Sequence, residues 1–462
     1  MRTRHHHLKH NALALAAAAV LGPLAATPAS AAVCTWNTAA GNWAALANWA
    51  ACVAGNGNPA GVPGSSDTAT IGAAGVVTIN TGQSVLNLNN AGQINIDAFG
   101  LNLVGGGSTA NTGVINVGGA STANLGVSAG HNINNTGGVI NVGNGSVINQ
   151  FGSTISGGTI NTTGTGALVA FGSGSNFLSG VTLNGLLDMA SGFGIERVIN
   201  GLTLGGTISV NNNSVLAFEG NNTVSGGGTI VLGNTGGSNR ISLDGTGTTT
   251  FAAGTTIRGE NGSIIAGTFV GGTQALVNNG TISADVAGGT ISINAAPVTN
   301  NGTLSALNGG TLVLNNSVSG GATGQIVAGV GSTVLQNGVA LSGTINTSGS
   351  GRFAASASGS NFLNGVTLNG SLDLASGTAF ERVIGSGLVL NGSVNLNNNS
   401  VLAFEGNGGL SGNGTIVLGN TGGSNRISLD GTGPPPSLRA PPFAAKTVPS
   451  RLEPLWAARR RW

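Results

Sequence analysis

The chain has 462 residues, of which 84 are glycine, while only 6% are charged and 4% are aromatic. It is nevertheless 40% hydrophobic, which excludes a disordered polar tract. The net charge of +2 arises at the two ends, because the stretch 33–433 contains six arginines, no lysine and twelve acidic residues. This central part has no basic surface for nucleic acid, and its scarcity of large side chains favours an elongated stack of thin layers over one spherical core.

Residues 1–31 are typical of a secretory signal peptide. Arg2 and Lys9 give a basic start, an apolar run follows, and Ala29-Ser30-Ala31 matches the small-residue pattern of a cleavage site. We therefore expect cleavage after Ala31 and export to the cell surface, the outer membrane or the extracellular space.

The mature start, residues 32–73, contains three of the five tryptophans and both cysteines of the chain. Trp36, Trp43 and Trp49 are regularly spaced, which suits a cap that covers the apolar end of a stack. An oxidising compartment favours a disulfide between Cys34 and Cys52. Further His or Cys ligands are absent from their neighbourhood, so we predict no metal site there.

Residues 74–433 consist of short Val/Ile/Leu/Thr runs separated by Gly, Asn and Ser. Similar segments recur at Gly113 and Gly138, and at Thr207 and Thr229. This is a period of roughly 20–25 residues, which is typical of a solenoid. Apolar residues alternate within the runs, which indicates strands with one buried face. The spacing leaves no room for crossover helices, so we predict an all-β, right-handed parallel β-helix (β-solenoid) with a short N-terminal cap.

Neighbouring coils of such a solenoid place equivalent residues about 4.8 Å apart. We therefore expect the asparagine runs 211–213 and 397–399 to form amide ladders from coil to coil, in preference to the alternative that they bind sugar. The block 173–247 returns as 358–433, with the segment 229–247 unchanged at 415–433. A repeat that long exceeds one structural unit, so we interpret it as about four coils copied together.

The tryptophan-rich opening, W…GNW…NW…G.P…D.A.I, resembles that of autotransporter passengers and other exported bacterial β-helical surface adhesins. The resemblance covers the stretch 33–433 and implies a surface-exposed solenoid. Two departures matter. The chain shows no signature of a two-partner secretion domain, and its last residues contain no strands of a translocator barrel. We therefore expect a truncated passenger.

The tail, residues 434–462, breaks from this composition. It corresponds to the continuation of the first copy read one base later, with Thr248–Thr250 opposite Pro434–Pro436 and Val270 opposite Trp456. We interpret it as an out-of-frame, unstructured segment and assign its arginines no function. The nucleotide sequence tests this interpretation, because restoring one base should recover further solenoid coils.

Ten charged residues in the duplicated blocks are the candidate site. Glu219 follows Glu196, and Arg240 follows Glu219, by close to one coil, so we expect Glu219 to lie beside Arg197 or Arg240. One interpretation is a carboxylate cluster of the kind that cleaves polysaccharides; the other is a set of ion pairs between coils. We favour ion pairs, because the chain has no Tyr and no Trp outside the cap and tail. The ten residues are Glu196, Arg197, Glu219, Arg240, Asp244, Glu381, Arg382, Glu405, Arg426 and Asp430.

The sequence thus predicts a non-enzymatic, rod-like adhesin or self-association scaffold. It predicts no catalytic residue, no metal and no cofactor. The expected partners are an unknown surface ligand or like molecules on neighbouring cells, with no nucleic acid, and a membrane only through a missing C-terminal barrel. The alternatives are a β-helical polysaccharide hydrolase or lyase, and a non-functional truncated product that remains in the periplasm.

Overall fold

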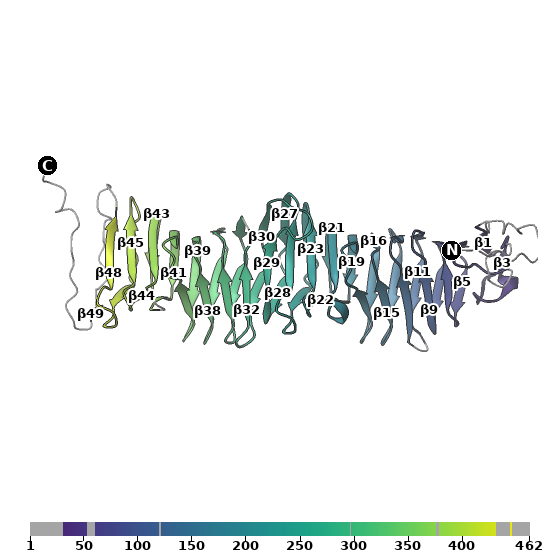
Figure 1. Cartoon of the computed structure of the whole chain (residues 1–462), viewed down its shortest axis with the longest axis horizontal. Coiled ribbons are helices and arrows are strands. Elements are labelled where there is room, and N and C mark those ends of the chain that lie inside the picture. The colour runs from purple at the N-terminus through teal and green to yellow at the C-terminus, as the bar shows by residue number, and fades with distance from the viewer. Residues whose placement is uncertain are drawn as a thin grey trace, which may run out of the picture.

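The computed structural model describes residues 31–52, 61–119, 122–295, 297–375, 378–430 and 444–445. They form a β-solenoid of about 16 stacked parallel turns (Figure 1). The predicted all-β fold is confirmed, because the described residues contain strands, two short 3₁₀ turns, η1 (Leu46–Asn48) and η2 (Ala190–Gly192), and no α-helix. The predicted signal peptide, apart from Ala31, and most of the predicted tail lie outside the described residues.

Each coil contributes strands to three faces, which we define by the strands that pair in parallel. Face 1 contains β1 (Val33–Trp36), β4 (Thr68–Ile71), β7 (Asn87–Asn90), β10 (Ser108–Asn111), β13 (Asn132–Asn134), β16 (Thr154–Ser156), the first halves of β19 (Phe177–Asn184) and β21 (Ile195–Leu204), β23 (Val215–Glu219), β26 (Arg240–Asp244), β29 (Asn261–Ala266), β32 (Thr290–Ile293), β35 (Thr311–Leu314), β38 (Thr333–Gln336), β40 (Arg352–Ala355), β42 (Ser371–Leu374), β44 (Ser393–Leu396) and β47 (Thr415–Leu418).

Face 2 contains β2 (Ala40–Asn42), β5 (Val76–Ile79), β8 (Gln93–Ile96), β11 (Val114–Val117), β14 (Val139–Val142), β17 (Thr159–Thr162), the second halves of β19 and β21, β24 (Asn222–Ser225), β27 (Gly247–Phe251), β30 (Gln274–Asn278), β33 (Val298–Asn300), β36 (Val318–Gly320), the first halves of β39 (Ala340–Thr347), β41 (Phe362–Asn369) and β43 (Phe380–Leu390), β45 (Val401–Glu405) and β48 (Arg426–Asp430).

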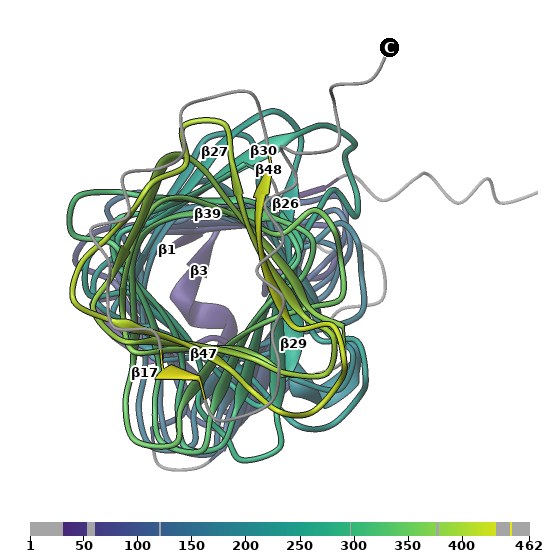
Figure 2. The same cartoon turned by 90° about the vertical axis from the view of Figure 1, so that its left-hand side faces the viewer.

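Face 3 contains β6 (Gln83–Val85), β9 (Phe99–Leu103), β12 (Ala123–Val127), β15 (Val147–Gln150), β18 (Ala167–Ala170), β20 (Leu186–Asp188), β22 (Thr207–Val210), β25 (Thr229–Leu232), β28 (Thr256–Gly259), β31 (Thr281–Ala284), β34 (Thr303–Ala306), β37 (Gln325–Ala328), the second halves of β39, β41 and β43, and β46 (Leu410–Ser411). The view along the rod shows the three faces enclosing one thin core (Figure 2).

Alternation along the strands fills this core with stacked aliphatic side chains. Ile94, Ile115, Ile140 and Ile160 pair in register on four successive coils, and none of them is exposed to solvent. The corners between faces are tight enough to require glycine in places. A Cβ on Gly107 would lie 1.8 Å from the carbonyl oxygen of Leu86 in the neighbouring coil. The abundance of glycine therefore follows from how closely the coils stack.

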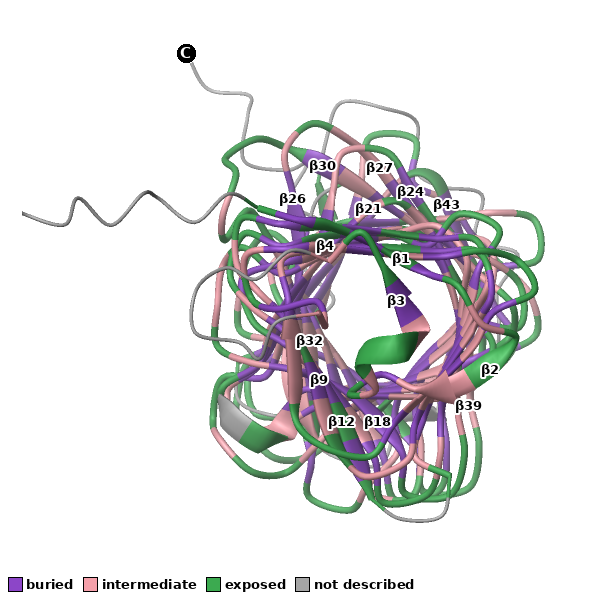
Figure 3. Ribbon diagram, turned by 90° about the vertical axis from the view of Figure 1, so that its right-hand side faces the viewer, coloured by how far each residue is buried: buried purple, intermediate pink, exposed green. Residues whose placement is uncertain are grey.

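The N-terminal cap closes the first coil. Strand β3 (Trp49–Ala50) turns back antiparallel to β1, and in Figure 3 β3 and the adjacent short turn lie across the ring of coils. Trp43 is fully buried, and its ring meets that of Trp49 edge-on at 4.9 Å between centroids. A disulfide joins Cys34 and Cys52, as the sequence suggested. The cap thus covers the apolar end with indole rings.

Equivalent strands in the two copies of the duplicated block lie on different faces of the rod. In the first copy Phe177 pairs with Thr154 of β16, on face 1. Its counterpart in the second copy, Phe362, pairs with Ala340 of β39, on face 2. The pairings within each copy are the same, so the copy retains its local structure and is rotated by one face.

Coil length accounts for this rotation. Eight successive pairings along face 1 lead from Ile195 to Asp373. The counterpart of Ile195 in the second copy is Phe380, which lies further along the chain than Asp373. The length of chain from Ile195 to Phe380 therefore exceeds a whole number of coils by the segment from Asp373 to Phe380. This segment leads through one turn to the next strand, so the second copy starts on face 2, where the first starts on face 1.

Two residues of the tail have a described backbone. Ala444–Ala445 forms β49, which pairs in parallel with β47. The rest of the predicted tail lies outside the described residues, so its unstructured, out-of-frame character stays a prediction.

Candidate functional site

Arg197 occupies the centre of the charged cluster in the first copy. It lies on face 1, in register with Phe177 of the preceding coil, and its guanidinium carbon lies 4.4 Å from the centre of that ring. Its Nε donates to Glu219 Oε1 on the next coil, and its Nη1 donates to the carbonyl oxygen of Gly174 at 2.8 Å. Of the two partners that the sequence allowed for Glu219, the structure selects Arg197.

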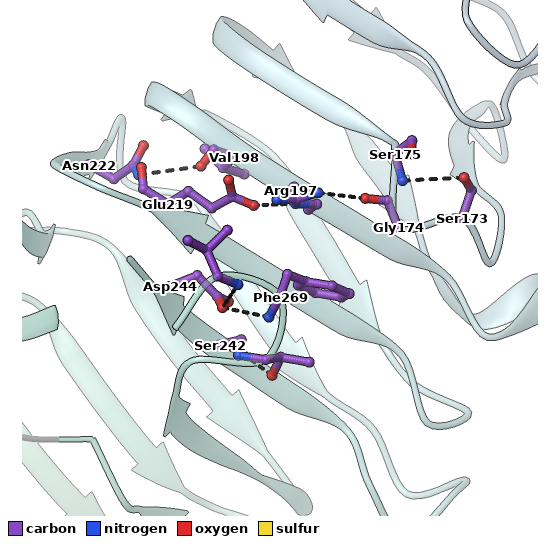
Figure 4. A network of polar contacts seen from close by, with 12 residues as sticks. Ser173, Gly174, Ser175, Arg197, Val198, Glu219, Asn222, Ser242, Asp244 and Phe269 are labelled. Atoms are coloured by element: carbon purple, nitrogen blue, oxygen red, sulfur yellow. Dashed lines mark hydrogen bonds and ion pairs between the residues drawn. The ribbon is translucent and has the colours of Figure 1, made fainter. Parts of the chain in front are cut away.

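A loop at residues 267–272 covers one side of this cluster (Figure 4). Asp244 Oδ1 accepts hydrogen bonds from the backbone N–H groups of Phe269 at 2.7 Å and Val270 at 2.9 Å. The Phe269 ring lies 5.2 Å from the guanidinium carbon of Arg197, so Arg197 contacts two aromatic rings, those of Phe177 and Phe269. The loop leaves Asp244 without solvent exposure, and Asp244 Oδ2 has no hydrogen-bond partner.

The second copy repeats the ion pair in a more open setting. Arg382 donates to both carboxylate oxygens of Glu405, with 2.7 Å between Nη2 and Oε2, and lies 4.8 Å from the Phe362 ring. The side chains of Arg382 and Glu405 are 32% and 22% exposed, against 16% and 15% for Arg197 and Glu219. Asp430, the counterpart of Asp244, is exposed and accepts a hydrogen bond from the Ser428 hydroxyl at 2.8 Å.

Glu196 and Glu381 lie apart from these ion pairs. Both side chains point into the core, have no solvent exposure, and have no hydrogen bond that meets ordinary geometry. Removal from water raises the pKa of each carboxyl well above its ordinary value of 4.5, because burial penalises the charged form. The structure therefore separates these residues from the outward-facing Arg197 and Arg382, although they are adjacent in sequence.

The structure does not bring Arg240 into the cluster. Val215 pairs with Arg240 and Glu219 with Asp244, so Arg240 stands at the opposite end of β26 from the ion pair. Its Nε donates to the carbonyl oxygen of Ser238 at 3.3 Å. Arg426 occupies the same end of β48 and is exposed.

These arrangements connect coils. The Arg197 guanidinium neutralises Glu219, and Asp244 accepts hydrogen bonds from the backbone of a loop. Glu196 is fully buried in the core. Within the described ranges no three His, Cys, Asp or Glu side chains gather as a metal site would require. Sequence reasoning missed the aromatic rings that contact the arginines, and it missed the loop at 267–272. The recurrence of Phe directly after Asn176 and Asn361 was the only available signal.

His131 is a structural residue of the core. Its Nδ1 lies 2.8 Å from the carbonyl oxygen of Val104, which can only accept, so Nδ1 carries the proton. Its Nε2 then accepts from the Thr109 hydroxyl at 2.9 Å. Burial lowers the pKa of His131 below 6.5, which favours the neutral ring.

The asparagine runs do not form the ladders that we expected. Asn211 Oδ1 accepts from the backbone N–H of Thr235 at 2.9 Å, and Asn397 Oδ1 accepts from the Thr421 hydroxyl at 2.9 Å. Their neighbours Asn212 and Asn213 adopt positive φ values of 58° and 64°, so these runs shape turns. The prediction of amide–amide ladders there is wrong, because the turn of the next coil supplies Thr and Ser as partners.

Asparagine ladders occur elsewhere, on strands. The outer asparagine ladder follows the solvent side of face 2, and each amide Nδ2 donates to the Oδ1 of the preceding coil at 2.8–3.1 Å. It consists of Asn95, Asn116, Asn141, Asn161 and Asn184.

Comparison with known proteins adds no family: no protein-family model matches the chain, and no curated protein is significantly similar to it. Over the residues whose structure is described, no helix combines the length and apolarity needed to cross a membrane.

Proposed function

We propose that this chain is a non-enzymatic, exported surface protein, similar to an autotransporter passenger, that acts as a rod-like adhesin or self-association scaffold. A stack of about 16 turns, at 4.8 Å per coil, makes a rod about 75 Å long. Such a rod holds repeated surfaces away from a cell, and weak contacts repeated along it add up through effective concentration.

The observation that carries the proposal is the use of the charged residues in the duplicated block. In each copy an Arg–Glu ion pair joins successive coils, Arg197 with Glu219 and Arg382 with Glu405. A glycosidase needs one carboxyl as acid and a second as base or nucleophile across a groove. Glu219 is instead paired with arginine, and Asp244 is covered. The copying therefore lengthens the rod and repeats its clamps.

The test uses the mature chain on beads or at a cell surface. We expect the displayed rod to cause aggregation or attachment, and the double variant Glu219→Gln/Glu405→Gln to retain it. A polysaccharide panel assayed for new reducing ends or unsaturated products checks the enzymatic alternative. Cleavage by the parent chain that disappears in the double variant would contradict the proposal and favour the hydrolase or lyase. Absence of both adhesion and cleavage would favour a non-functional product.

A further inference from the structure

The outer asparagine ladder lies along a groove. The groove has a volume of about 380 Å³ and is lined by the first four ladder residues and by the corner that follows them. Gly118, Gly119 and Gly143 have no side chains that would fill the groove, and Thr163 and Asp97 also line it. From Asn95 to Asn161 the groove follows three coil steps, which is about 14 Å along the rod axis.

The ladder leaves polar atoms free to bind a ligand. An asparagine amide has two N–H donors and an oxygen with two lone pairs. Asn116, Asn141 and Asn161 each use one donor and one lone pair within the ladder. All three side chains are partly exposed, so each can offer a further donor and acceptor to a molecule in the groove.

We propose that this groove binds a neutral, extended, β-linked glycan, an inference that rests on the proposed role as an adhesin and specifies its ligand class. The ladder repeats about every 4.8 Å, close to the length that one β-1,4-linked hexose adds to an extended chain. Hydroxyl groups both donate and accept, as the free amide atoms require. Adjacent rings of such a chain are turned over, but both edges of each ring carry polar groups that can hydrogen-bond. Each coil can therefore offer one donor and one acceptor to each successive sugar.

The same geometry disfavours other occupants. An extended peptide repeats side chains on one side about every 6.8 Å, which does not match the coil spacing. A polyanion would meet Asp97 and no basic residue in the groove wall. A second rod would match the spacing, but its flat face does not enter a recess. Because the wall contains no aromatic ring, we expect binding of one oligosaccharide to be weak. Several rods displayed together strengthen it through effective concentration.

The experiment measures binding of cellotetraose and chitotetraose to the soluble mature chain by ligand-observed NMR and calorimetry. Maltotetraose, which curves, and oligogalacturonate, which is charged, serve as comparison ligands. We expect Asn141→Ala to weaken binding about fivefold or more, since a lost hydrogen bond changes affinity by several-fold. Asn369→Ala is the matched control, because it breaks an equivalent exposed ladder between Asn346 and Asn391 on face 3.

A second variant tests the groove without touching the ladder. A Cβ on Gly119 would lie 2.9 Å from Asp97 Oδ1, so Gly119→Leu should fill the groove and abolish binding. Gly237→Leu is its control, because Gly237 is exposed and a Cβ there would meet nothing within 4 Å. Unfolding curves of each variant and its control establish that the fold is retained.

Binding of the β-linked ligands that both groove variants reduce and both controls retain supports the inference. Absence of binding, equal loss in variants and controls, or stronger binding of oligogalacturonate overturns it. Concentration-dependent dimers that Gly119→Leu removes would identify a second rod as the occupant and also overturn it. If displayed rods still adhere when glycan binding fails, only this inference is wrong; glycan binding without adhesion instead contradicts the proposed function.

Discussion

Replacing both core carboxyls, Glu196→Gln and Glu381→Gln, should make the solenoid more stable at neutral pH and reduce the dependence of its stability on pH. Both carboxyls are fully buried, and burial raises the pKa of each well above 4.5. The unfolded chain loses these protons near its ordinary pKa, whereas the folded chain keeps them. Between the two pKa values the folded state holds more protons, so stability falls as pH rises.

The size of the effect follows from proton counting. Above pH 4.5 each carboxyl that stays protonated only in the folded state lowers the free energy of unfolding by about 1.4 kcal/mol per pH unit, until the pH reaches its folded pKa. The two together contribute about 3 kcal/mol per unit where both windows overlap. Glutamine has nearly the same shape and no charge, so the double variant lacks this term at every pH.

Urea unfolding of the parent chain and the variants at several pH values from 4.5 to 8 measures the difference. We expect the double variant to gain stability over the parent as pH rises, with each single variant supplying part of the gain. Glu260→Gln, which removes a partly exposed acid, serves as the control for the loss of an acidic group outside the core. A double variant that loses stability at pH 7 would refute the reasoning, because it would mean that the carboxyls are ionised and paired in the folded protein.

Three further predictions concern the core and the cap. His131→Gln should remove a pH dependence of stability that has the opposite sign. Burial lowers the pKa of His131, so the stability that its neutral ring provides is present above pH 6.5 and is lost as pH falls through the folded pKa. Urea unfolding at pH 5 and 8 measures this difference. Cys34→Ala/Cys52→Ala should cost about 3 kcal/mol and open the cap to protease, and equal digestion rates with and without the disulfide would contradict this. Phe218→Ala should lower the free energy of unfolding by about 3–5 kcal/mol, because Phe218 is fully buried against Phe251. Phe193→Ala, at an exposed corner, should change it by less than about 0.5 kcal/mol. Thermal unfolding compares the two variants.

Much of the fold was readable because strand alternation and coil spacing are local properties of the sequence. Thr207–Val210, for example, is a strand in which every second residue is buried, as the alternation predicted. The spacing of Thr207 and Thr229 is a true pairing distance. So is that of Gly113 and Gly138, because the residues that follow them, Val114 and Val139, pair in register. The repeats thus predicted the register of the ladder as well as the presence of strands.

The site was less predictable, because charge and alternation disagree at Glu196. Its side chain shares the inward side of β21 with Val198, as the period of two requires. Sequence reasoning grouped it with the other charged residues, in a carboxylate cluster or in ion pairs between coils, since ionised carboxylates avoid a core. The raised pKa resolves the disagreement, because a protonated carboxyl can occupy a core position. The same argument applies to Glu381 and Val383 in the second copy.

The rotation of the second copy could not be read from the sequence at all. Coils along face 1 differ in length, from a short one between Ala354 and Asp373 to a long one between Ser263 and Ser292. The separation of the two copies therefore does not divide into a known number of coils. The rotation nevertheless shows what the sequence encodes. A strand sequence that spans faces 1 and 2 as β19 spans faces 2 and 3 as β41, so the faces accept the same strand and turn pattern.

This interchangeability has a consequence for adhesion. The duplication in this chain extends the rod without breaking its core, although the displacement of the second copy is not a whole number of coils. It also turns copied surface patches to a new direction. Any surface that the duplicated block presents therefore faces different sides of the rod in its two copies, and the two copies do not bind one flat surface together. Under the proposed function such a rod is better suited to bridging partners on several sides than to lying along one surface, and bead aggregation should exceed attachment to a flat film coated with the same ligand.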